Sequence, residues 1–294
     1  MPNIQLEFGL WYVAGGLYQL AHAFRERLEE VGVTVCLQHE VLRIESEGSV
    51  VTGVQVRSPD NGTQTMSADY VVSNMEVIPA LQRLLRSPAS VIRKLRRFEP
   101  SCSGIVLHLG LDRVYPQLAH HNFFYSKDLH GNFHRVFREK KLPDDPTLYV
   151  VAPTRTDPSQ APSGCDNIKI LPHIPYINDR HPYTREDYAA FKELCLQKLE
   201  RLGLTDLRRH IVVEDFWTPF DIEARCASNR GSIYGVVSDR RRNFAFKAPK
   251  RSSQFDNLLF VGGSVNPGAG MPMVTLGGQH VARMIVEQEV TGKP

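Results

Sequence analysis

The stretch from Asn257 to Glu289 constrains this chain more than any other, because it joins an apolar run, a glycine-rich loop and a helical pattern. The run Leu258–Val261 has the length and composition of a short strand buried on both faces. The loop that follows is rich in glycine, so its backbone can approach a bound group closely. Beyond Pro272, apolar residues recur near helical spacing to about Glu289. The free amides at such a helix start favour an anionic or electron-rich ligand.

Spacing alone leaves two interpretations of this loop open. Gly268, Ala269 and Gly270 supply half of a G-x-G-x-x-G dinucleotide fingerprint, but Met273 stands where the third glycine belongs. A loop that only closes one edge of a sheet explains the spacing about as well as a cofactor loop does.

The complete string V-G-G-S-V-N-P-G-A-G-M-P-M-V, followed by a helix, resembles the C-terminal flavin-binding motif of the phytoene desaturase family. Members of that family are flavoproteins that dehydrogenate or oxidise carotenoid precursors. The resemblance implies FAD as the cofactor, with Gly262 and Gly263 near its pyrophosphate and ribityl chain. It also implies that Gly270, Met271, Pro272 and Met273 form a helix start that lies under the isoalloxazine ring. A helix N-terminus there would stabilise negative charge on the reduced flavin.

Shorter motifs elsewhere are similar to bacterial carotenoid desaturases and their diapocarotenoid oxygenase relatives. E-V-L-R-I at 40–44 and V-V-S-N at 71–74 match the second segment of the family's FAD domain. The resemblance implies that Val41 contacts the adenine through its backbone and that the strand ending at Asn74 runs toward the cofactor. On spacing alone, Val41 is a core valine. Further matches, such as W-T-P at 217–219 and G-S-I-Y-G-V at 231–236, extend the resemblance over nearly the whole chain.

The family begins with a strand, a G-x-G-x-x-G turn and a helix that hold the ADP part of FAD, and no G-x-G-x-x-G occurs in these 294 residues. Gly15 and Gly16 do not provide it, because Leu17 and Gln19 stand where the fingerprint requires glycine. We therefore expect a truncated chain that corresponds to the C-terminal portion of the family's length. It would need a partner chain carrying the missing unit, or would be a non-catalytic fragment. By itself it should bind FAD weakly and expose an apolar sheet edge.

The predicted fold class is α/β. It consists of a partial glutathione-reductase-like FAD-binding domain and a mixed α+β substrate domain built on an antiparallel sheet. Residues 1–82 are expected to form the second segment of the FAD-binding domain and residues 83–250 the substrate-binding domain. Residues 251–294 supply the C-terminal FAD-binding strand, glycine loop and helix.

Local patterns predict the individual elements. Extended segments or strands are expected at 5–13, 33–37, 41–44, 50–56, near 65, and at 70–73, 103–111, 120–125, 148–152, 168–172, 211–216 and 258–261. Helices are expected at 17–31, at 79–98 in two pieces split near Pro88, at 184–202, at 218–226 and after Pro272. Thr218, Pro219 and Asp221 form a helix-start pattern. The antiparallel strands in the middle of the chain are expected to form the floor of a substrate cavity.

Composition limits the class of protein and its partners. The formal net charge is only +3 and the densest basic run, Arg240–Arg242, is short, so no nucleic-acid partner is predicted. Five widely spaced cysteines without a C-x-x-C pair indicate reduced thiols in a cytoplasmic protein without a zinc site. The sequence contains neither a run of eighteen apolar residues nor a signal-peptide pattern. A peripheral contact with the inner face of the cell membrane stays open.

Histidines do not predict a metal site. His120 and His121 are adjacent and would face opposite ways in a strand, so they cannot both bind one metal. His173 is the better candidate for a polar group that lines a cavity, although a structural role is favoured.

The leading functional hypothesis is an FAD-dependent oxidoreductase that desaturates a long polyene, a carotenoid precursor of the phytoene or diapophytoene type. The alternative within the family is oxidation of a terminal methyl group of such a polyene. An apolar substrate offers nothing to ionise, and the cofactor supplies the hydride acceptor. This agrees with the lack of a Ser-His-Asp or paired-carboxylate pattern, and no catalytic residue is nominated.

Overall fold

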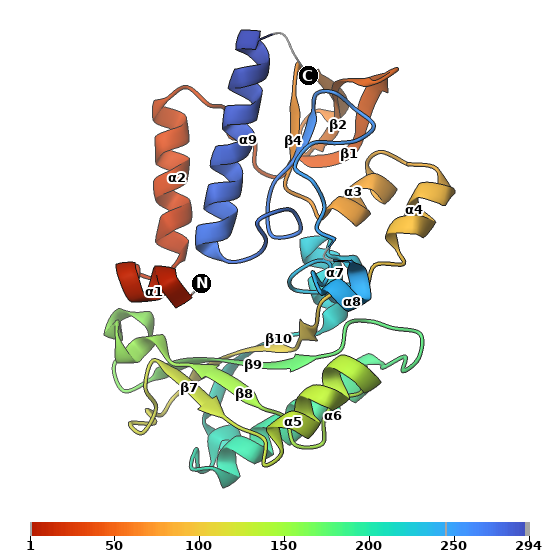
Figure 1. Cartoon of the computed structure of the whole chain (residues 1–294). Helices are drawn as coiled ribbons and strands as arrows, with labels where there is room; N and C mark the ends of the chain where they lie inside the picture. The colour runs from red at the N-terminus through yellow and green to blue at the C-terminus, as the bar shows by residue number, and fades with distance from the viewer. Residues whose placement is uncertain (1, 245, 292–294) are drawn as a thin grey trace. The chain divides into compact units, whose positions relative to one another are not determined.

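The computed structural model describes residues 2–244 and 246–291 (Figure 1). The chain forms two compact units that alternate along the sequence. Unit 1 comprises Met1–Leu37, Ile105–His173 and Tyr183–Trp217. Unit 2 comprises Gln38–Gly104, Ile174–Pro182 and Thr218–Pro294.

Unit 1 is built on an antiparallel sheet, as the alternating pattern predicts. Its strands lie in the order β10 (Ile211–Trp217), β6 (Val106–Leu111), β9 (Asp166–Ile174), β8 (Leu148–Val151) and β7 (His121–Phe124). In this register Leu109 lies opposite both Ile168 and Glu214. One face of the sheet is buried: Leu107, Leu109, Leu148, Val150, Ile168 and Ile170 are each 0% exposed. Along β9 every second residue is buried and the others are partly exposed, so the opposite face of the sheet is open.

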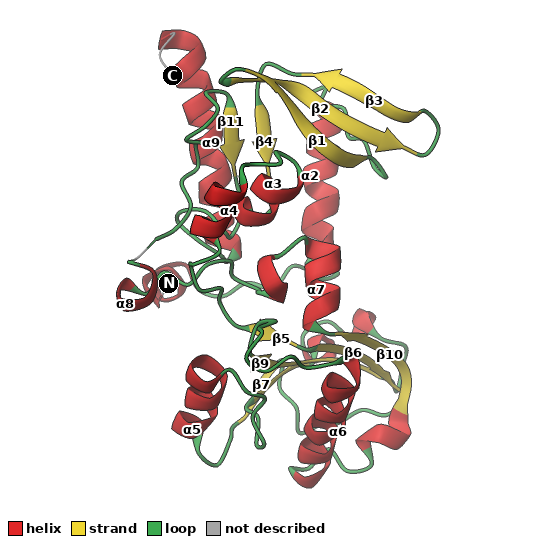
Figure 2. Cartoon of the chain, turned by 90° about the vertical axis from the view of Figure 1, so that its right-hand side faces the viewer, coloured by secondary structure: helices red, strands yellow, loops and turns green. Residues whose placement is uncertain are grey.

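Helix α6 (Arg185–Arg201) lies against the buried side of this sheet (Figure 2). Thr184 begins it with a capping box: the Thr184 Oγ1 accepts from the Asp187 amide, and the Asp187 carboxylate accepts from the Thr184 amide. The buried ammonium of Lys198 donates to the carbonyls of Tyr125 and Pro146 and to Asp145. These bonds attach the helix to the connection between β7 and β8. Near them lie α5 (Leu129–His134) and a π-helical turn, Arg135–Glu139.

The N-terminal part of unit 1 differs from two predictions. Residues 5–13 were predicted to be extended, but α1 spans Pro2–Phe8. Gln5, Leu6 and Glu7 are good helix formers, and Gly9 at φ +76° ends the helix. The segment 33–37 forms no strand. Valines favour a strand only where a partner strand is available, and this segment pairs with none in the described chain. The predicted helix at 17–31 is confirmed as α2 (Tyr18–Glu30).

Unit 2 holds two small sheets. Strands β1 (Glu40–Glu47), β2 (Val50–Ser58) and β3 (Gly62–Ser67) form an antiparallel meander. Strand β4 (Val71–Ser73) pairs in parallel with β11 (Leu258–Phe260), with Leu259 opposite Val72. The predicted burial of β11 on both faces is confirmed, since Leu258 and Leu259 are 0% exposed and Phe260 is 2% exposed.

The helices of unit 2 are short except for the last. They are α3 (Val77–Arg83), α4 (Ala89–Leu95), α7 (Pro219–Cys226), α8 (Arg240–Asn243) and α9 (Met271–Thr291), and a two-residue strand, β5 (Ser103–Gly104), follows α4. The predicted break near Pro88 is confirmed, because Pro88 occupies the N-cap of α4. None of the helices in the described part of the chain is long and apolar enough to cross a membrane.

Candidate functional site

The glycine loop begins where the parallel strands β4 and β11 end. The Val261 amide donates to the Ser73 carbonyl at 3.0 Å, so the loop leaves β11 beside Asn74. Gly262 has φ +100°, and a Cβ at this position would lie 2.8 Å from Asn74 Oδ1. The structure therefore brings together two predicted cofactor residues that are 188 positions apart in the sequence. A side chain at position 262 would meet both a strained backbone and a steric clash.

The far end of the loop starts helix α9. A Cβ on Gly263 would lie 3.0 Å from the Ala269 Cβ, so the loop folds back on itself. Gly270 has φ +109°, and its carbonyl accepts the first helical bond, from the Val274 amide at 2.9 Å. The predicted residues Met271, Pro272 and Met273 form the first turn. Pro272 has no amide hydrogen, but the amides of Met271 and Met273 have no partner within the helix, so they can bind an anionic or electron-rich group.

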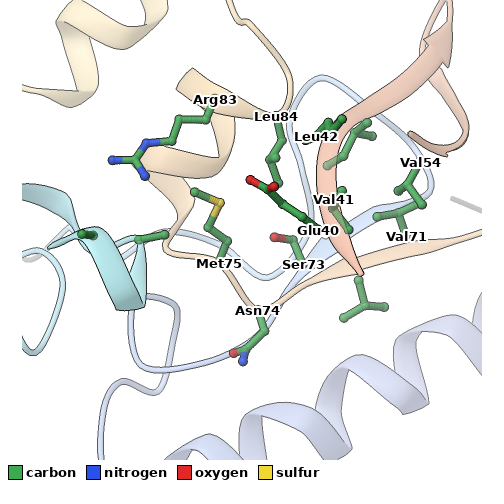
Figure 3. A pocket seen from close by; sticks show the side chains of 14 residues that line it. Glu40, Val41, Leu42, Val54, Val71, Ser73, Asn74, Met75, Arg83 and Leu84 are labelled. Carbon is green, nitrogen blue, oxygen red and sulfur yellow. The ribbon is translucent and has the colours of Figure 1, made fainter. Parts of the chain in front are cut away.

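A cavity of about 570 Å³ lies in unit 2 beside β1 and β4 (Figure 3). Val41 and Asn74, both predicted cofactor residues, are part of its lining. Apolar side chains such as Val54, Val71 and Leu84 make up much of the rest, with Glu40, Ser73 and Arg83 as polar members. The volume is in the range of small-molecule and cofactor sites. Sequence spacing alone treated Val41 as a core residue, but its side chain is 39% exposed.

The backbone at Val41 is irregular. In the pairing of β1 with β2, Val41 lies opposite Val56 and Arg43 lies opposite Gln55, so the register skips Leu42. An extra residue of this kind is a β-bulge, and bulges leave backbone groups without a ladder partner. Such a site can offer main-chain atoms to a ligand in the adjoining cavity.

The predicted residues form two groups joined by Asn74. Val41 and Asn74 line the cavity, whereas Gly262, Gly263 and the first turn of α9 are not among its lining residues. Asn74 belongs to both groups, since it also contacts Gly262. A ligand held by all the predicted residues must therefore be extended, as a dinucleotide is.

Two half-buried charged residues near the loop have no counterpart in the sequence analysis. Glu76 Oε2 accepts from the Asn229 amide at 2.6 Å, while Glu76 Oε1 is buried with no hydrogen-bond partner in the described residues. Burial raises the pKa of Glu76, against the lowering effect of that amide bond and of Lys247. The sequence does contain a signal for a buried acid here, because Glu76 stands among apolar neighbours in N-M-E-V-I at 74–78.

Lys247 is the second of these residues. Its Nζ donates to the carbonyls of Tyr234 and Val236, each at 3.1 Å. Burial lowers its pKa, and Glu76 partly offsets this. A Cβ on Gly268 would lie 3.6 Å from its Cε, so this cation packs directly against the glycine loop.

The open face of the unit 1 sheet carries a row of aromatic rings. The rings of Phe123 and Tyr149 stack at 4.9 Å, and those of Phe123 and Tyr125 at 6.0 Å. The Tyr149 hydroxyl lies 2.8 Å from His121 Nδ1. Phe123 is 56% exposed and Tyr125 is 60% exposed. The aromatic row shares this face with polar residues, among them His108, Lys169 and His173.

The histidines of this face correct one prediction. The rings of His120 and His121 lie 4.4 Å apart rather than on opposite faces, because His120 precedes β7 and is not held to the strand's alternation. His120 bonds to Thr156 instead. His173 lies half-buried on β9, and burial lowers its pKa. Within residues 2–244 and 246–291, no three His, Cys, Asp or Glu side chains are grouped so that they could hold a metal ion.

Comparisons with known proteins agree on a flavoprotein. The family model for flavin containing amine oxidoreductases matches residues 5–286. A 4,4′-diapolycopene oxygenase of Methylomonas sp. is 58% identical over 286 residues, which cover 97% of this chain and 57% of the relative. A 4,4′-diaponeurosporene oxygenase of Staphylococcus aureus is 53% identical over 292 residues, which cover 99% of this chain and 58% of the relative. The chain thus spans a little more than half the length of these relatives.

Solved structures support the fold. An oxidoreductase from Methanosarcina mazei superposes with a TM-score of 0.60 at 15% identity, over 92% of this chain and 55% of that one. Cyclohexylamine oxidase from Brevibacterium oxydans superposes with a TM-score of 0.53 at 15% identity, over 93% of this chain and 53% of that one. The glycine loop, the parallel strand pair and the match over residues 5–286 together show that the chain belongs to the flavin containing amine oxidoreductase family, with FAD as its cofactor.

Proposed function

We propose that the protein is an FAD-dependent oxidoreductase that oxidises a terminal carbon of a diapocarotenoid. The observation that carries this is the 58% identity over 286 residues with a 4,4′-diapolycopene oxygenase. The 53% identity with a 4,4′-diaponeurosporene oxygenase supports the same substrate class. Desaturation of a polyene precursor, the leading hypothesis from the sequence, becomes the second candidate because both of these relatives are oxygenases.

The residues of unit 2 fit an extended dinucleotide. We propose that the adenine lies in the 570 Å³ cavity beside the bulge at Val41. Asn74, Gly262 and Gly263 would hold the pyrophosphate and ribityl chain, because glycines leave the backbone of the loop open to a close approach. Gly270 and the first turn of α9, residues 271–273, would lie under the isoalloxazine ring and stabilise negative charge there. The bound flavin supplies the oxidising chemistry, which the protein's side chains lack.

The residues around the loop would orient the cofactor. The partnerless Glu76 Oε1 is available to accept a hydrogen bond from a hydroxyl group. Lys247, packed against Gly268, adds positive charge on the loop side. As part of the same proposal, residues 1–82 and 251–294 are the FAD-binding segments and residues 83–250 contain the substrate-binding part.

We propose that the substrate lies on the open face of the unit 1 sheet. A polyene has no group to ionise, so it is bound by contact with apolar and aromatic surface. The row of Phe123, Tyr125 and Tyr149 provides such a surface.

The five cysteines are free thiols, which supports the cytoplasmic location we propose.

The edge of β4 is where a further segment would join. The outer side of β11 is covered by the segment before it. The Phe260 amide donates to the Lys250 carbonyl, and the Ser252 amide donates to the Leu258 carbonyl. On β4, Val71 and Ser73 bond toward β11, so the register turns the amide and carbonyl of Val72 toward the other edge. Val72 is 43% exposed. We propose that a strand followed by a G-x-G-x-x-G turn and a helix, on a partner chain or on the same polypeptide, adds in parallel at this edge and completes the FAD site.

The test supplies the strand, G-x-G-x-x-G turn and helix of the Methylomonas relative to this chain, fused or co-expressed, and measures FAD by absorbance after gel filtration. The chain alone should bind FAD weakly, because several charge-assisted bonds to the pyrophosphate are absent. The supplied unit should raise the affinity by orders of magnitude. Tight stoichiometric FAD in the chain alone would refute the need for the unit.

Three variants sharpen this experiment, two at Val72 and one at Gly270. Val72→Pro should block assembly by removing the outward amide, while Val72→Thr keeps that amide and should assemble normally. Gly270→Val should prevent FAD uptake and pigment oxidation, because a β-branched side chain is strained at φ +109°. The product, an oxidised or a further desaturated polyene, is read from the pigments of cells that make the precursor. Normal FAD and pigment in Gly270→Val would show that the loop only closes a sheet edge.

A further inference from the structure

Positive charge is concentrated in one helical hairpin of unit 2. The 22 residues Val77–Phe98, which contain α3 and α4, carry six Arg or Lys and no Asp or Glu. The whole chain has a formal net charge of only +3, so all the other residues together are formally negative. This hairpin is therefore the basic pole of an otherwise slightly acidic chain.

The six cations are not neutralised within the fold. The six are Arg83, Arg86, Arg93, Lys94, Arg96 and Arg97. All of them are exposed, and in the described residues none forms an ion pair. Arg96 donates only to the amide oxygen of Gln82, at 3.0 Å. A solvated charged face usually mixes both signs, because like charges at helical spacing repel each other. Six unpaired cations without an acid point instead to an anionic partner.

The hairpin surface is hollowed. A shallow depression of about 690 Å³ is lined by Arg93, Arg96 and Arg97, with Ala89 and Ile92 between them. Guanidinium groups around such a depression suit phosphate oxygens, which they can bind through two parallel hydrogen bonds. The apolar positions below them suit the first carbons of an acyl chain or glycerol backbone.

An exposed aromatic residue lies beside the end of the hairpin. Phe244 is 85% exposed. It lies between two anchored residues, since Asn243 bonds to the backbone of Glu99 and Phe246 stacks on Phe98 at 3.9 Å. Phe98 and Glu99 directly follow Arg97, so the bonds of Asn243 to Glu99 hold the residue before Phe244 near the end of the hairpin.

We propose that the basic hairpin, Val77–Phe98, together with Phe244, binds the anionic headgroups of a lipid bilayer. Clusters of four to eight basic residues on amphipathic helices bind such surfaces, and an adjacent aromatic side chain inserts at the interface. A nucleic acid is less well matched. Gln82 is the only Asn or Gln in the segment, and these side chains are common readers of base edges. The proposal does not depend on FAD or on the reaction.

The experiment is vesicle flotation of the 294-residue chain without added FAD. Vesicles of phosphatidylcholine alone are compared with vesicles that contain about one third phosphatidylglycerol, at low and high salt. The chain should float with the anionic vesicles only, and high salt should weaken the binding. The triple variant Arg93→Gln, Arg96→Gln and Arg97→Gln should bind about a hundredfold more weakly.

A matched control removes three exposed cations elsewhere: Arg138→Gln, Arg180→Gln and Arg283→Gln. It changes the net charge equally and should bind within about twofold of the wild type. Phe244→Ser should weaken binding to a smaller degree that persists at high salt. Circular dichroism confirms that each variant is folded.

Three outcomes would overturn the proposal. The hairpin variant and the control could lose binding equally, which would indicate net charge alone. The chain could float equally with neutral vesicles, which would indicate an apolar surface elsewhere. A duplex or single-stranded oligonucleotide could bind the hairpin while anionic vesicles do not, which would assign it to nucleic acid. The flavin-binding test is unaffected by any of these results.

Discussion

The antiparallel sheet of unit 1 and the parallel strand pair of unit 2 have equally buried cores but differ in completeness. Both contain leucines that are 0% exposed, such as Leu107 on β6 and Leu259 on β11. The antiparallel sheet has five consecutive strands, its own covering helix and a buried Lys198 that fastens that helix. The parallel pair has two three-residue strands and an open edge at Val72.

This difference suits unit 1 to a structural role and unit 2 to the binding role that we propose for it. The five strands in the continuous order of the unit 1 sheet all come from residues 106–217, and β6 pairs with β10 across about 100 residues of chain. Parallel strands require long crossovers, and here β4 and β11 come from segments about 190 residues apart. Their common carboxyl end carries Asn74 and the glycine loop, which is where open parallel sheets bind ligands.

The largest expected effect contrasts the two cores. Leu107→Ala should destabilise unit 1 by about 3 kcal/mol, since the site is fully packed and cannot collapse around the cavity. Leu259→Ala should destabilise its sheet by less than half as much, because two short strands relax more easily. Hydrogen exchange of β6 and β11 amides, followed by mass spectrometry, measures both local stabilities. Equal losses would mean that the parallel pair is as well supported as the antiparallel sheet.

The next contrast lies within unit 2 and compares two glycines. Gly262→Ala should destabilise the loop by about 1 to 3 kcal/mol, because φ is +100° and the new Cβ would clash with Asn74. Gly278→Ala on α9 meets nothing within 4 Å and should be neutral or stabilising by up to about 1 kcal/mol. Thermal unfolding of the two variants gives the comparison. A Gly262→Ala protein as stable as Gly278→Ala would show that the loop has more freedom than its geometry indicates.

A smaller effect compares one helix-capping motif in the two units. Thr184 and Asp187 cap α6 in unit 1, and Thr218 donates through its amide and hydroxyl to Asp221 at the start of α7 in unit 2. Each Thr→Ala change should destabilise its helix by about 1 kcal/mol. In unit 1 the loss should appear in global unfolding, which the fluorescence of the half-buried Trp217 reports because it lies in that unit. In unit 2 it should remain local to α7, and a global loss there would contradict the contrast.

The smallest expected effect concerns acid. The hydroxyl of Ser159 and the amide of Gly15 donate to Asp157 and hold the pKa of its carboxyl at about 2. Because the folded-state pKa is depressed, the stabilisation is complete above the ordinary value near pH 4 and is lost as the pH falls toward 2. Protection of the Gly15 amide should fall over that range in the wild type, whereas in Asp157→Asn it should be weak at every pH. An unchanged Gly15 amide in the variant would show that this carboxylate does not hold the Tyr12–Gly16 segment.

The structure contradicts two predicted strands and reveals two charged residues that the sequence did not single out. Residues 5–13 alternate like a strand, but helix propensity and Gly9 made α1. The Val33–Leu37 pattern lacks a strand partner, so it stays irregular. Glu76 and Lys247 are charged residues in ordinary contexts, and only their burial beside the glycine loop identifies them. The proposed cofactor roles of Val41, Asn74, Gly262, Gly263 and Gly270–Met273 stay predictions.

The sequence by itself determined the local elements: alternation marked the strands of the antiparallel sheet, and the capping residues of α6 and α7 marked their starts. The string from Leu258 to Met273 also carried the family and the cofactor. Only the tertiary structure decided that β4 pairs with β11, that Asn74 meets Gly262, and that the chain alternates between two units. The physical reason is that periodicity and propensity are set by neighbouring residues, whereas pairing and burial depend on segments far apart in the chain.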